Sequence, residues 1–421
     1  MGIKRVFPSV IRGTVYAPSS KSVTQRAVIM AMLAKGESVI KNPSLSDDSI
    51  TAIDLVSKLG VKQKIVDETL ILESSGYLGS NKKFVLNCKE SGLLLRMVSP
   101  VLSLSNGKFT LTGEGSLKKR PMGMIEKELS ELGAKIKSKG GYPPIGITGP
   151  ISGGKIEVDG SITSQFISGL LMALPICFED STLIVNNLKS RPYINITLTM
   201  LKDAGIIIKE DINSDIFKIN GKQQYNPLNL TVEGDWSSAS FLLIAGAIAG
   251  EVTVKNLRTD SPQADKAILD VLDLTGAEII ISDNDISVKK GKLPPFQFDI
   301  SESPDLFPPI AALAVFCNGK STIYGTGRLK YKESNRTEAI KKEFNTLGIR
   351  VDIFDDKVEI FGDIVKGGRR VSSHNDHRIA MALALTGLGA SDNIEIEGWN
   401  SVSKSYKNFF DDLSSLGARI E

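Results

Sequence analysis

Four cationic side chains stand at or just inside the first turns of predicted helices in this 421-residue chain: Lys21, Arg26, Arg96 and Arg378. A cation at this end of a helix opposes the helix dipole unless an anion lies between the two. The N–H groups at a helix start also bind anions, so a helix start with a nearby cation is suited to a phosphate or a carboxylate. These positions predict a site for an anionic small molecule.

The polar residues around the same helix starts also have a purely structural interpretation. Ser, Thr, Asp and Asn satisfy the unpaired N–H groups of a first turn, and capping alone accounts for the neighbourhoods of Ser20, Ser237 and Asn375. Charged loops after the predicted strands are either solvated surface groups or six equivalent loops that converge on one polyanion pocket. These loops lie at 47–48, 118–120, 190–191, 330–336 and around Lys404.

A sequence repeat organises the whole chain. Six amphipathic segments end in a similar phrase, such as LVSKLGVKQ, LSELGAKIK and LSSLGARIE, and their glycines are 69 to 73 residues apart. Each glycine follows the last apolar position of a predicted helix, which predicts a C-terminal cap that leads into a strand. The six glycines are Gly60, Gly133, Gly205, Gly276, Gly348 and Gly417.

Each repeat also has an earlier helix that is apolar on nearly all sides and is therefore expected to be buried. SVTQRAVIMAMLAKG and NDHRIAMALALTGLG are examples, and a short strand such as SVIKN or NIEIEG follows each one. Strands and helices thus alternate, with three repeats in each of two lobes at about 20–230 and 235–421. We expect the strand at 10–17 to complete a sheet of the second lobe, with the hinge near 17–20 and 229–235.

Composition and motifs exclude several functional classes. The formal net charge is only +3, which does not favour nucleic acid or a membrane surface as a partner. We expect no signal peptide and no membrane span, and the sequence has no dinucleotide, P-loop or zincin motif. Three widely spaced cysteines and two histidines predict neither a disulfide framework nor a metal site. A cytoplasmic protein that relies on carboxylates, lysines and arginines is expected.

Four phrases resemble one enzyme family. PSSKSVTQRA, GSITSQFISGLLMALP, KESNRTEAI and NDHRIAMALAL are similar to segments of the 5-enolpyruvylshikimate-3-phosphate synthases, from the first strand to the C-terminus. The resemblance implies an α/β fold, a two-lobed inside-out α/β barrel of six βαβαββ repeats with three per lobe. One lobe is then discontinuous, residues 1–17 and 231–421, and the other is 18–230. The active site is expected in the cleft between the lobes.

The resemblance also implies a reaction. The enolpyruvyl group of phosphoenolpyruvate moves to the 5-hydroxyl of shikimate 3-phosphate and phosphate is released, on the route to chorismate and the aromatic amino acids. The hydroxyl adds to C2 while C3 is protonated, and elimination from the tetrahedral intermediate reverses both proton transfers. The family needs no cofactor or metal, and a monomer that acts on these two small molecules is expected. Two phosphates and two carboxylates on the substrates require a cluster of guanidinium and ammonium groups.

Site residues follow from the resemblance position by position. Matches to shikimate 3-phosphate ligands are Lys21, Ser22, Arg26, Thr163, Ser164, Gln165, Ser190, Asp305 and Lys332. Matches to phosphoenolpyruvate ligands are Lys21, Gly92, Arg120, Gln165, Arg336, Arg378 and Lys404. Asp305 matches the carboxylate that takes the hydroxyl proton, although its place before an apolar helix also fits a simple cap. Glu333 and Lys21 are both candidates for the protonation of C3.

Two segments depart from the family's pattern. The usual N-A-G-T-A-M-R-P reads ESGLLLRM here, so Glu90 replaces Asn, Leu93 replaces Thr and Met97 replaces Pro. We expect Glu90 to pair with an arginine that binds phosphoenolpyruvate, and we expect these changes to alter inhibition by glyphosate, which the family binds in the same place. Arg328 aligns with a common Asn of the shikimate-phosphate pocket and is expected to strengthen phosphate binding.

Three other functions fit parts of the pattern. The sister carboxyvinyltransferase that acts on UDP-N-acetylglucosamine shares the fold, but it usually has a reactive Cys before the arginine that matches Arg120, and the loop 113–119 has none. An RNA-terminal phosphate cyclase-like enzyme would show a catalytic His motif and a basic face, which are not visible. A non-catalytic binding protein would not need Asp305, Glu333 and Lys21 together.

Overall fold

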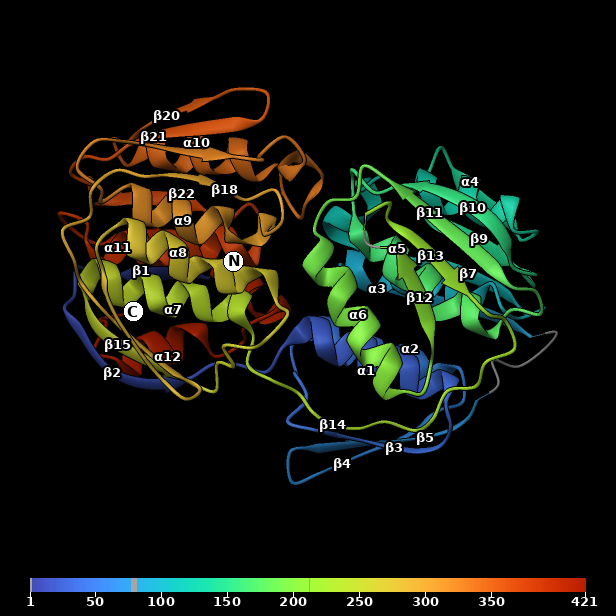
Figure 1. The fold of residues 1–421 in the computed structure, drawn as a ribbon. Helices are drawn as coiled ribbons and strands as arrows, with labels where there is room; N and C mark the ends of the chain where they lie inside the picture. The colour runs from blue at the N-terminus through green and yellow to red at the C-terminus, as the bar shows by residue number, and fades with distance from the viewer. Residues whose placement is uncertain (1, 77–81, 212) are drawn as a thin grey trace. The chain divides into compact units, whose positions relative to one another are not determined.

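The computed structural model describes residues 2–76, 82–211 and 213–421, which form two compact units. Unit 1 comprises Met1–Pro18 and Glu233–Glu421, and unit 2 comprises Ser19–Val232. Each unit has its own hydrophobic core and three sheets in the described ranges (Figure 1). No helix in this part of the chain is long and apolar enough to cross a membrane.

The four-stranded sheets share one topology: two parallel strands, followed by two that extend the sheet in antiparallel fashion. The first sheet of unit 2 has the strand order β14 (Asn229–Thr231), β3 (Lys35–Lys41), β5 (Thr69–Ser75) and β4 (Lys62–Val66). The second has the order β6 (Lys83–Asn87), β7 (Lys108–Thr112), β9 (Tyr142–Thr148) and β8 (Lys135–Lys139). The third has the order β10 (Gly154–Asp159), β11 (Ser181–Asn186), β13 (Ile216–Ile219) and β12 (Ile208–Asp211). Those of unit 1 are β2 (Ile11–Tyr16), β15 (Gly250–Lys255), β17 (Asp285–Lys289) and β16 (Glu278–Ser282); and β18 (Gln297–Asp299), β19 (Lys320–Tyr324), β21 (Lys357–Phe361) and β20 (Arg350–Ile353).

Strands from the chain's ends complete the sheets of unit 1. The strand expected at 10–17 is β2, which pairs in parallel with β15 so that Ile11 lies opposite Gly250. The remaining sheet consists of β22 (Arg369–Ser372), β23 (Ile394–Glu397) and β1 (Ile3–Val6). Val6 of β1 forms a bridge with Ile420 in the C-terminal tail, so both ends of the chain close the same sheet.

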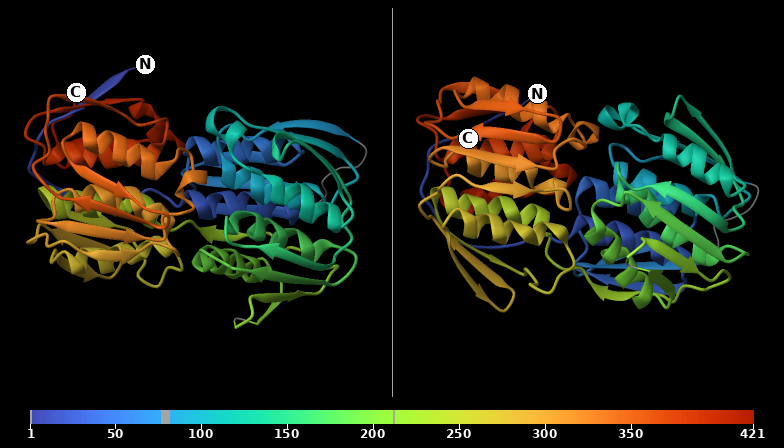
Figure 2. Two further views of the ribbon diagram at one scale, coloured as in Figure 1. Left: turned by 90° about the horizontal axis from the view of Figure 1, so that it is seen from above. Right: turned by 45° about the horizontal axis from the view of Figure 1, so that its top comes forward.

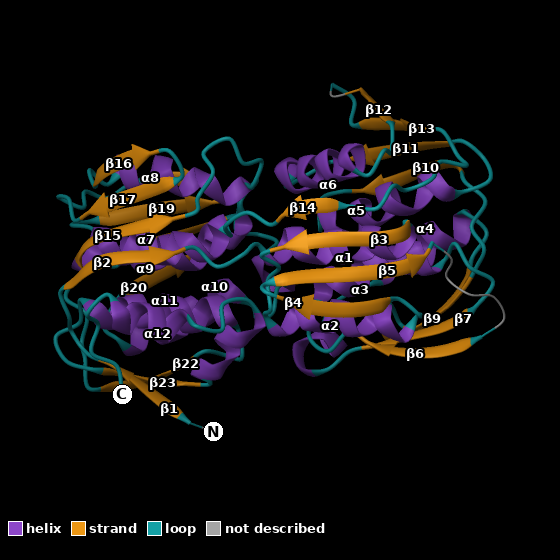
Figure 3. Cartoon of the chain, turned by 90° about the horizontal axis from the view of Figure 1, so that it is seen from below, coloured by secondary structure: helices purple, strands orange, loops and turns teal. Residues whose placement is uncertain are grey.

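Two kinds of helix alternate along the chain. The inner helices are almost wholly buried, as their apolar sequences predict: α1 (Lys21–Leu33), α3 (Gly92–Leu102), α5 (Ser164–Ala173), α7 (Trp236–Ala249), α9 (Phe307–Ala314) and α11 (His377–Leu388). The amphipathic helices are α2 (Asp47–Lys58), α4 (Gly123–Glu131), α6 (Arg191–Asp203), α8 (Ile268–Leu274), α10 (Arg336–Thr346) and α12 (Phe409–Ser415). In each unit the sheets surround the inner helices (Figures 2 and 3), which confirms the predicted inside-out α/β arrangement.

The six repeat glycines end the amphipathic helices as predicted. Each is the second residue after the last helical one, and all six have φ between 64° and 105°. This left-handed conformation strains residues that have a Cβ, so glycine is the residue that turns the chain from helix to strand at least cost. The repeat that is visible in the sequence is therefore a repeat of helix ends.

Candidate active site

Side chains cap most of the inner helices and so fix the backbone around the predicted site residues. Ser20 accepts a hydrogen bond from the first turn of α1, and Thr163 does the same for α5, which confirms the capping interpretation near Ser20. For α7 and α11 the caps are carboxylates, Asp235 and Asp376, which lie beside the residues named from the sequence. Ser91 caps α3.

Asp305 is not a cap, and this alternative from the sequence is wrong. It lies in a short 3-10 helix, η4 (Pro304–Leu306), and the N-cap position of α9 belongs to Leu306, which has no capping side chain. The carboxylate of Asp305 instead contacts cationic side chains. The side chains around Asp305 therefore balance its negative charge.

In unit 2, Arg26 is a buried cation whose described contacts are all neutral oxygens. Its Nε donates to Thr197 Oγ1 at 2.8 Å and its Nη1 to Ser22 O at 2.9 Å. Its Nη2 donates to Tyr193 O at 3.2 Å and to Ser168 Oγ at 3.4 Å. Burial lowers the pKa of Arg26 to about 10. A guanidinium at this position would be stabilised by an anion, as expected for a phosphate ligand.

Two further predicted residues of unit 2 have ionic or polar partners. Lys21, the first residue of α1, contacts Asp48 at the start of α2, with 3.0 Å between Nζ and Oδ2. Gln165 in the first turn of α5 accepts a hydrogen bond from Arg96 Nη1 at 2.8 Å. Asp48 and Arg96 thus hold two of the predicted ligand residues in place.

Arg120 and Gly92 lie directly against each other. A Cβ on Gly92 would come within 2.5 Å of Nη1 of Arg120, so a side chain at position 92 would push the guanidinium away. Arg120 follows a short 3-10 helix, η1 (Gly115–Lys119), and is 5% exposed. Glycine at the start of α3 is therefore required for this position of Arg120.

Glu90 holds the loop that carries Arg120. Its Oε2 accepts hydrogen bonds from Ser116 N and Ser116 Oγ, each at 3.2 Å. A Cβ on Gly115, whose φ is +47°, would lie 2.5 Å from the Glu90 carboxyl carbon. The expected pairing of Glu90 with an arginine stays a prediction.

The remaining predicted residues of unit 2 lie at helix starts. Ser164 is the first residue of α5 and is buried. Ser190 is buried directly before α6 and has a left-handed backbone with φ of 58°.

In unit 1, Arg328 donates to Ser301 O. Its expected contribution to phosphate binding stays a prediction.

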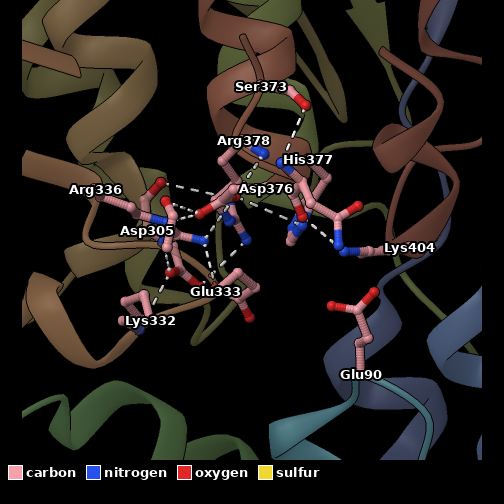
Figure 4. Close-up of polar contacts among 12 residues, drawn as sticks. Glu90, Asp305, Lys332, Glu333, Arg336, Ser373, Asp376, His377, Arg378 and Lys404 are labelled. Atoms are coloured by element: carbon pink, nitrogen blue, oxygen red, sulfur yellow. Dashed lines mark hydrogen bonds and ion pairs between the residues drawn. The ribbon is translucent and has the colours of Figure 1, made fainter. Parts of the chain in front are cut away.

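In unit 1, Arg336 lies among three carboxylates (Figure 4). Its Nη1 is 2.8 Å from Asp305 Oδ1 and its Nη2 is 2.8 Å from Glu333 Oε2. Its Nε is 2.9 Å from Asp376 Oδ2, and the Arg336 side chain is only 1% exposed. These carboxylates raise the pKa of Arg336 against the opposing effect of burial, so the guanidinium is firmly charged.

Asp305 in turn contacts three cations. Besides Arg336, Lys332 Nζ lies 3.3 Å from Oδ1 and Arg378 Nη2 lies 3.2 Å from Oδ2. Burial alone would raise the pKa of Asp305, but Arg378, Lys332 and Arg336 hold it well below its usual value. Burial lowers the pKa of Lys332 to about 8 despite the attraction of Asp305. We call these residues the unit 1 cluster: Asp305, Lys332, Glu333, Arg336, Asp376 and Arg378.

Lys404 lies near the cluster in the same unit. It ends a 3-10 helix, η6 (Trp399–Lys404), and its Nζ donates to Asn375 O at 2.6 Å. Asn375 directly precedes Asp376, so one loop contacts both Lys404 and Arg336. The structure thus brings Asp305, Lys332, Glu333, Arg336 and Arg378 together and holds Lys404 through the adjacent backbone.

Comparison with known proteins decides the family. A family model described as EPSP synthase (3-phosphoshikimate 1-carboxyvinyltransferase) matches residues 7–413. The chain belongs to the EPSP synthase family. Proteins named 3-phosphoshikimate 1-carboxyvinyltransferase from Methanosarcina mazei and Methanocorpusculum labreanum are 40% and 35% identical to it. The matches cover 98% of this chain and 97% of the first relative, and 97% of both chains for the second.

Solved structures of an EPSP synthase and of another enolpyruvyl transferase have the same fold. The enzyme from Acinetobacter baumannii superposes with a TM-score of 0.82 at 25% identity, covering 100% of this chain and 99% of that chain. The enolpyruvyl transferase NikO from Streptomyces tendae gives a TM-score of 0.80 at 18% identity, covering 100% of this chain and 98% of that chain, which shows the fold alone.

Sequence reasoning on this member of the EPSP synthase family missed one central residue. Asp376 is fully buried, caps α11 and also contacts Arg336, but the sequence suggested only a cap in this neighbourhood. The sequence feature that points to Asp376 is its place between Asn375, named above for capping, and Arg378, named as a phosphoenolpyruvate ligand. With Asp376 included, the unit 1 cluster has three carboxylates and three cations, an arrangement that can bind an anion by exchanging partners and can transfer a proton.

Proposed function

We propose that this protein transfers the enolpyruvyl group of phosphoenolpyruvate to the 5-hydroxyl of shikimate 3-phosphate and releases phosphate. The observation that carries the proposal is the EPSP synthase family match over residues 7–413, supported by relatives of that activity at 35% and 40% identity over nearly their full lengths. The reaction places the protein in the biosynthesis of chorismate and the aromatic amino acids.

Arg26 is our candidate for the phosphate of shikimate 3-phosphate. The acceptors it contacts carry no formal charge, so its positive charge is available to a dianionic group. Ser22 and Ser190 at nearby helix starts would add hydroxyl groups, and Lys21 would contact both substrates. Thr163, Ser164 and Gln165 at the start of α5, with Asp305 and Lys332 of unit 1, complete the set that the family resemblance assigns to this substrate.

Arg336, Arg378 and Lys404 of unit 1, with Arg120 of unit 2, are our candidates for the phosphate and carboxylate of phosphoenolpyruvate. In the free protein the two arginines of the cluster are already paired with carboxylates. Binding is therefore an exchange in which substrate oxygens replace part of these contacts. Because the substrates bring four anionic groups, we propose that residues of both units act on one substrate pair.

Asp305 is our candidate for the base that accepts the 5-hydroxyl proton. In the free protein its pKa is too low for an effective base, because Arg378, Lys332 and Arg336 stabilise its ionised form against the cost of burial. An anionic substrate that takes over contacts with Arg378 and Arg336 reduces this stabilisation and raises the pKa of Asp305. Phosphoenolpyruvate would thus activate the base that deprotonates the hydroxyl group attacking it.

The proton balance of the reaction requires a second group at C3. Asp305 takes the hydroxyl proton as oxygen bonds to C2, and an acid gives a proton to C3. In the elimination step the C2–oxygen bond to phosphate breaks and a proton leaves C3. Glu333 and Lys21 are the two candidates for this acid. Deuterium uptake from solvent into C3 distinguishes them, since only the variant that lacks the acid loses the uptake while still binding both substrates.

The proposed function is tested by phosphate release. Purified protein with phosphoenolpyruvate and shikimate 3-phosphate is expected to release phosphate, and the same protein with UDP-N-acetylglucosamine as acceptor is not. The opposite preference would assign it to the sister enzyme class.

We place the protein in the cytoplasm, because its three cysteines are all buried and free, as is usual under reducing conditions.

A further inference from the structure

The segment 372–376 runs from the last residue of β22 to the residue before α11 and contains two residues with an uncommon backbone conformation. His374 and Asn375 are consecutive and both left-handed, with φ of 51° and 56°. Residues with a Cβ adopt this conformation uncommonly, although Asn and His do so more often than most, and surrounding contacts stabilise it. Ser373 provides some of them, since its Oγ donates to Gly398 O at 2.9 Å and accepts from Asn375 N at 3.2 Å.

Helix α10 holds this segment at two places. Arg336 and Glu343 lie seven residues apart on α10, two turns along the same face. Arg336 contacts Asp376 at one end of the segment, with 2.9 Å between Nε and Oδ2. Glu343 accepts hydrogen bonds from Ser372 N at 3.0 Å and from His374 Nε2 at 2.7 Å. The segment is therefore anchored on both sides of Asn375.

The contact of Glu343 with His374 has the properties of a structural anchor. The Glu343 side chain is 4% exposed and that of His374 is 27% exposed. Burial alone would raise the pKa of Glu343, but the hydrogen bonds from His374 and Ser372 lower it below its usual value. Glu343 is thus ionised, and the imidazole Nε2 carries the proton that it donates.

The anchored backbone presents one group to the proposed substrate site. Asn375 O accepts a hydrogen bond from Lys404 Nζ at 2.6 Å, and the direction of this carbonyl depends on the left-handed turn before it. We propose that His374, through Glu343, is a positioning residue for Lys404 and hence for the binding of phosphoenolpyruvate. This inference rests on the proposed function, and it predicts an effect on one substrate only.

Steady-state kinetics with each substrate varied separately tests the proposal. His374→Leu keeps the bulk of the ring but has no donor, whereas His374→Gln keeps a donor of similar reach. We expect His374→Leu to raise the KM for phosphoenolpyruvate about tenfold or more, to leave the KM for shikimate 3-phosphate within about twofold, and His374→Gln to recover most of the loss. Asn345→Ala, at an exposed position on the same helix, is the control and should match the wild type.

Three outcomes would overturn the inference: equal increases in both KM values, no change in either, or a glutamine variant as impaired as the leucine variant. If leucine prevents folding, Glu343→Gln gives the same comparison, because it keeps an acceptor for Ser372 N and weakens only the bond to the ring. Its KM for phosphoenolpyruvate must then rise selectively. A wild-type protein that releases no phosphate from these substrates contradicts the proposed function instead.

Discussion

Replacing Asp305 with Asn removes one negative charge from the unit 1 cluster and keeps the shape of the side chain. The cluster then has three cations and two carboxylates, and Lys332, Arg336 and Arg378 lose a shared partner. Removing one partner of a buried ion pair costs about 3–5 kcal/mol. Since the Asp305 side chain is 22% exposed, solvent reduces this, and we expect a loss of about 2–3 kcal/mol.

The stability loss has a defined dependence on pH. The pKa of Asp305 is lowered in the folded protein, so its contribution is fully present above its unfolded pKa near 4 and disappears as the pH falls through the folded value. At pH 7 the loss corresponds to a decrease in Tm of roughly 4–12 °C for a unit of this size. The difference in Tm between wild type and variant should shrink in acid.

Catalysis and binding should respond in opposite directions. Asn cannot accept the hydroxyl proton, so turnover is expected to fall about 100- to 10,000-fold. Phosphoenolpyruvate should bind at least as tightly, because the cations no longer have to leave Asp305. Thermal melting, calorimetry with both substrates and turnover are measured together, with the exposed Asp299→Asn as the control. A variant with wild-type turnover would refute the base assignment, and an unchanged Tm would refute the charge argument.

Three other predictions concern the binding of substrates and of glyphosate. Arg26→Gln should raise the KM for shikimate 3-phosphate about 10- to 100-fold and abolish the increase in Tm that this substrate gives the wild type; an unaffected KM contradicts the phosphate assignment. Lys332, whose pKa burial lowers to about 8, should lose its proton above that pH, so the KM for shikimate 3-phosphate should rise there in the wild type but not in Lys332→Arg. Glyphosate should compete more strongly in a Glu90→Asn, Leu93→Thr double variant, because a negative charge leaves the site; equal inhibition constants would disprove this.

The fold was largely predictable because its determinants are local. A glycine after an amphipathic helix needs only its own backbone conformation to end that helix, and all six repeat glycines adopt it. An inner helix such as α7 is apolar on nearly all sides, and every residue in it is buried. Neither property depends on where other repeats lie, so spacing and composition were sufficient.

The candidate site was less predictable because its contacts join distant positions. Arg336 contacts Asp305, 31 residues earlier, and Asp376, 40 residues later. Asp305 and Asp376 are one repeat apart and both stand before inner helices, but no periodicity relates Arg336 to either of them. The family resemblance supplied Arg336 and Asp305 but not Asp376. The position of Asp305 before a helix suggested a cap, yet its carboxylate binds Arg378, 73 residues away. Contacts between such distant residues form only when the repeats pack together, so the sequence pattern alone does not predict them.

Arg26 of unit 2 and Arg336 of unit 1 have different partners, and this difference affects how each would bind an anion. Arg26 in unit 2 contacts neutral oxygens and has its pKa lowered by burial, so an arriving phosphate meets no competing carboxylate among the contacts described for Arg26. Arg336 in unit 1 is already matched by three carboxylates, so an arriving anion must displace at least one of them. An anion at Arg26 would therefore displace no carboxylate described there, whereas an anion at Arg336 would, as would one at Lys21 of unit 2, which contacts Asp48. In the mechanism proposed above, the same displacement would raise the pKa of Asp305, so part of the binding energy in unit 1 would make Asp305 a stronger base.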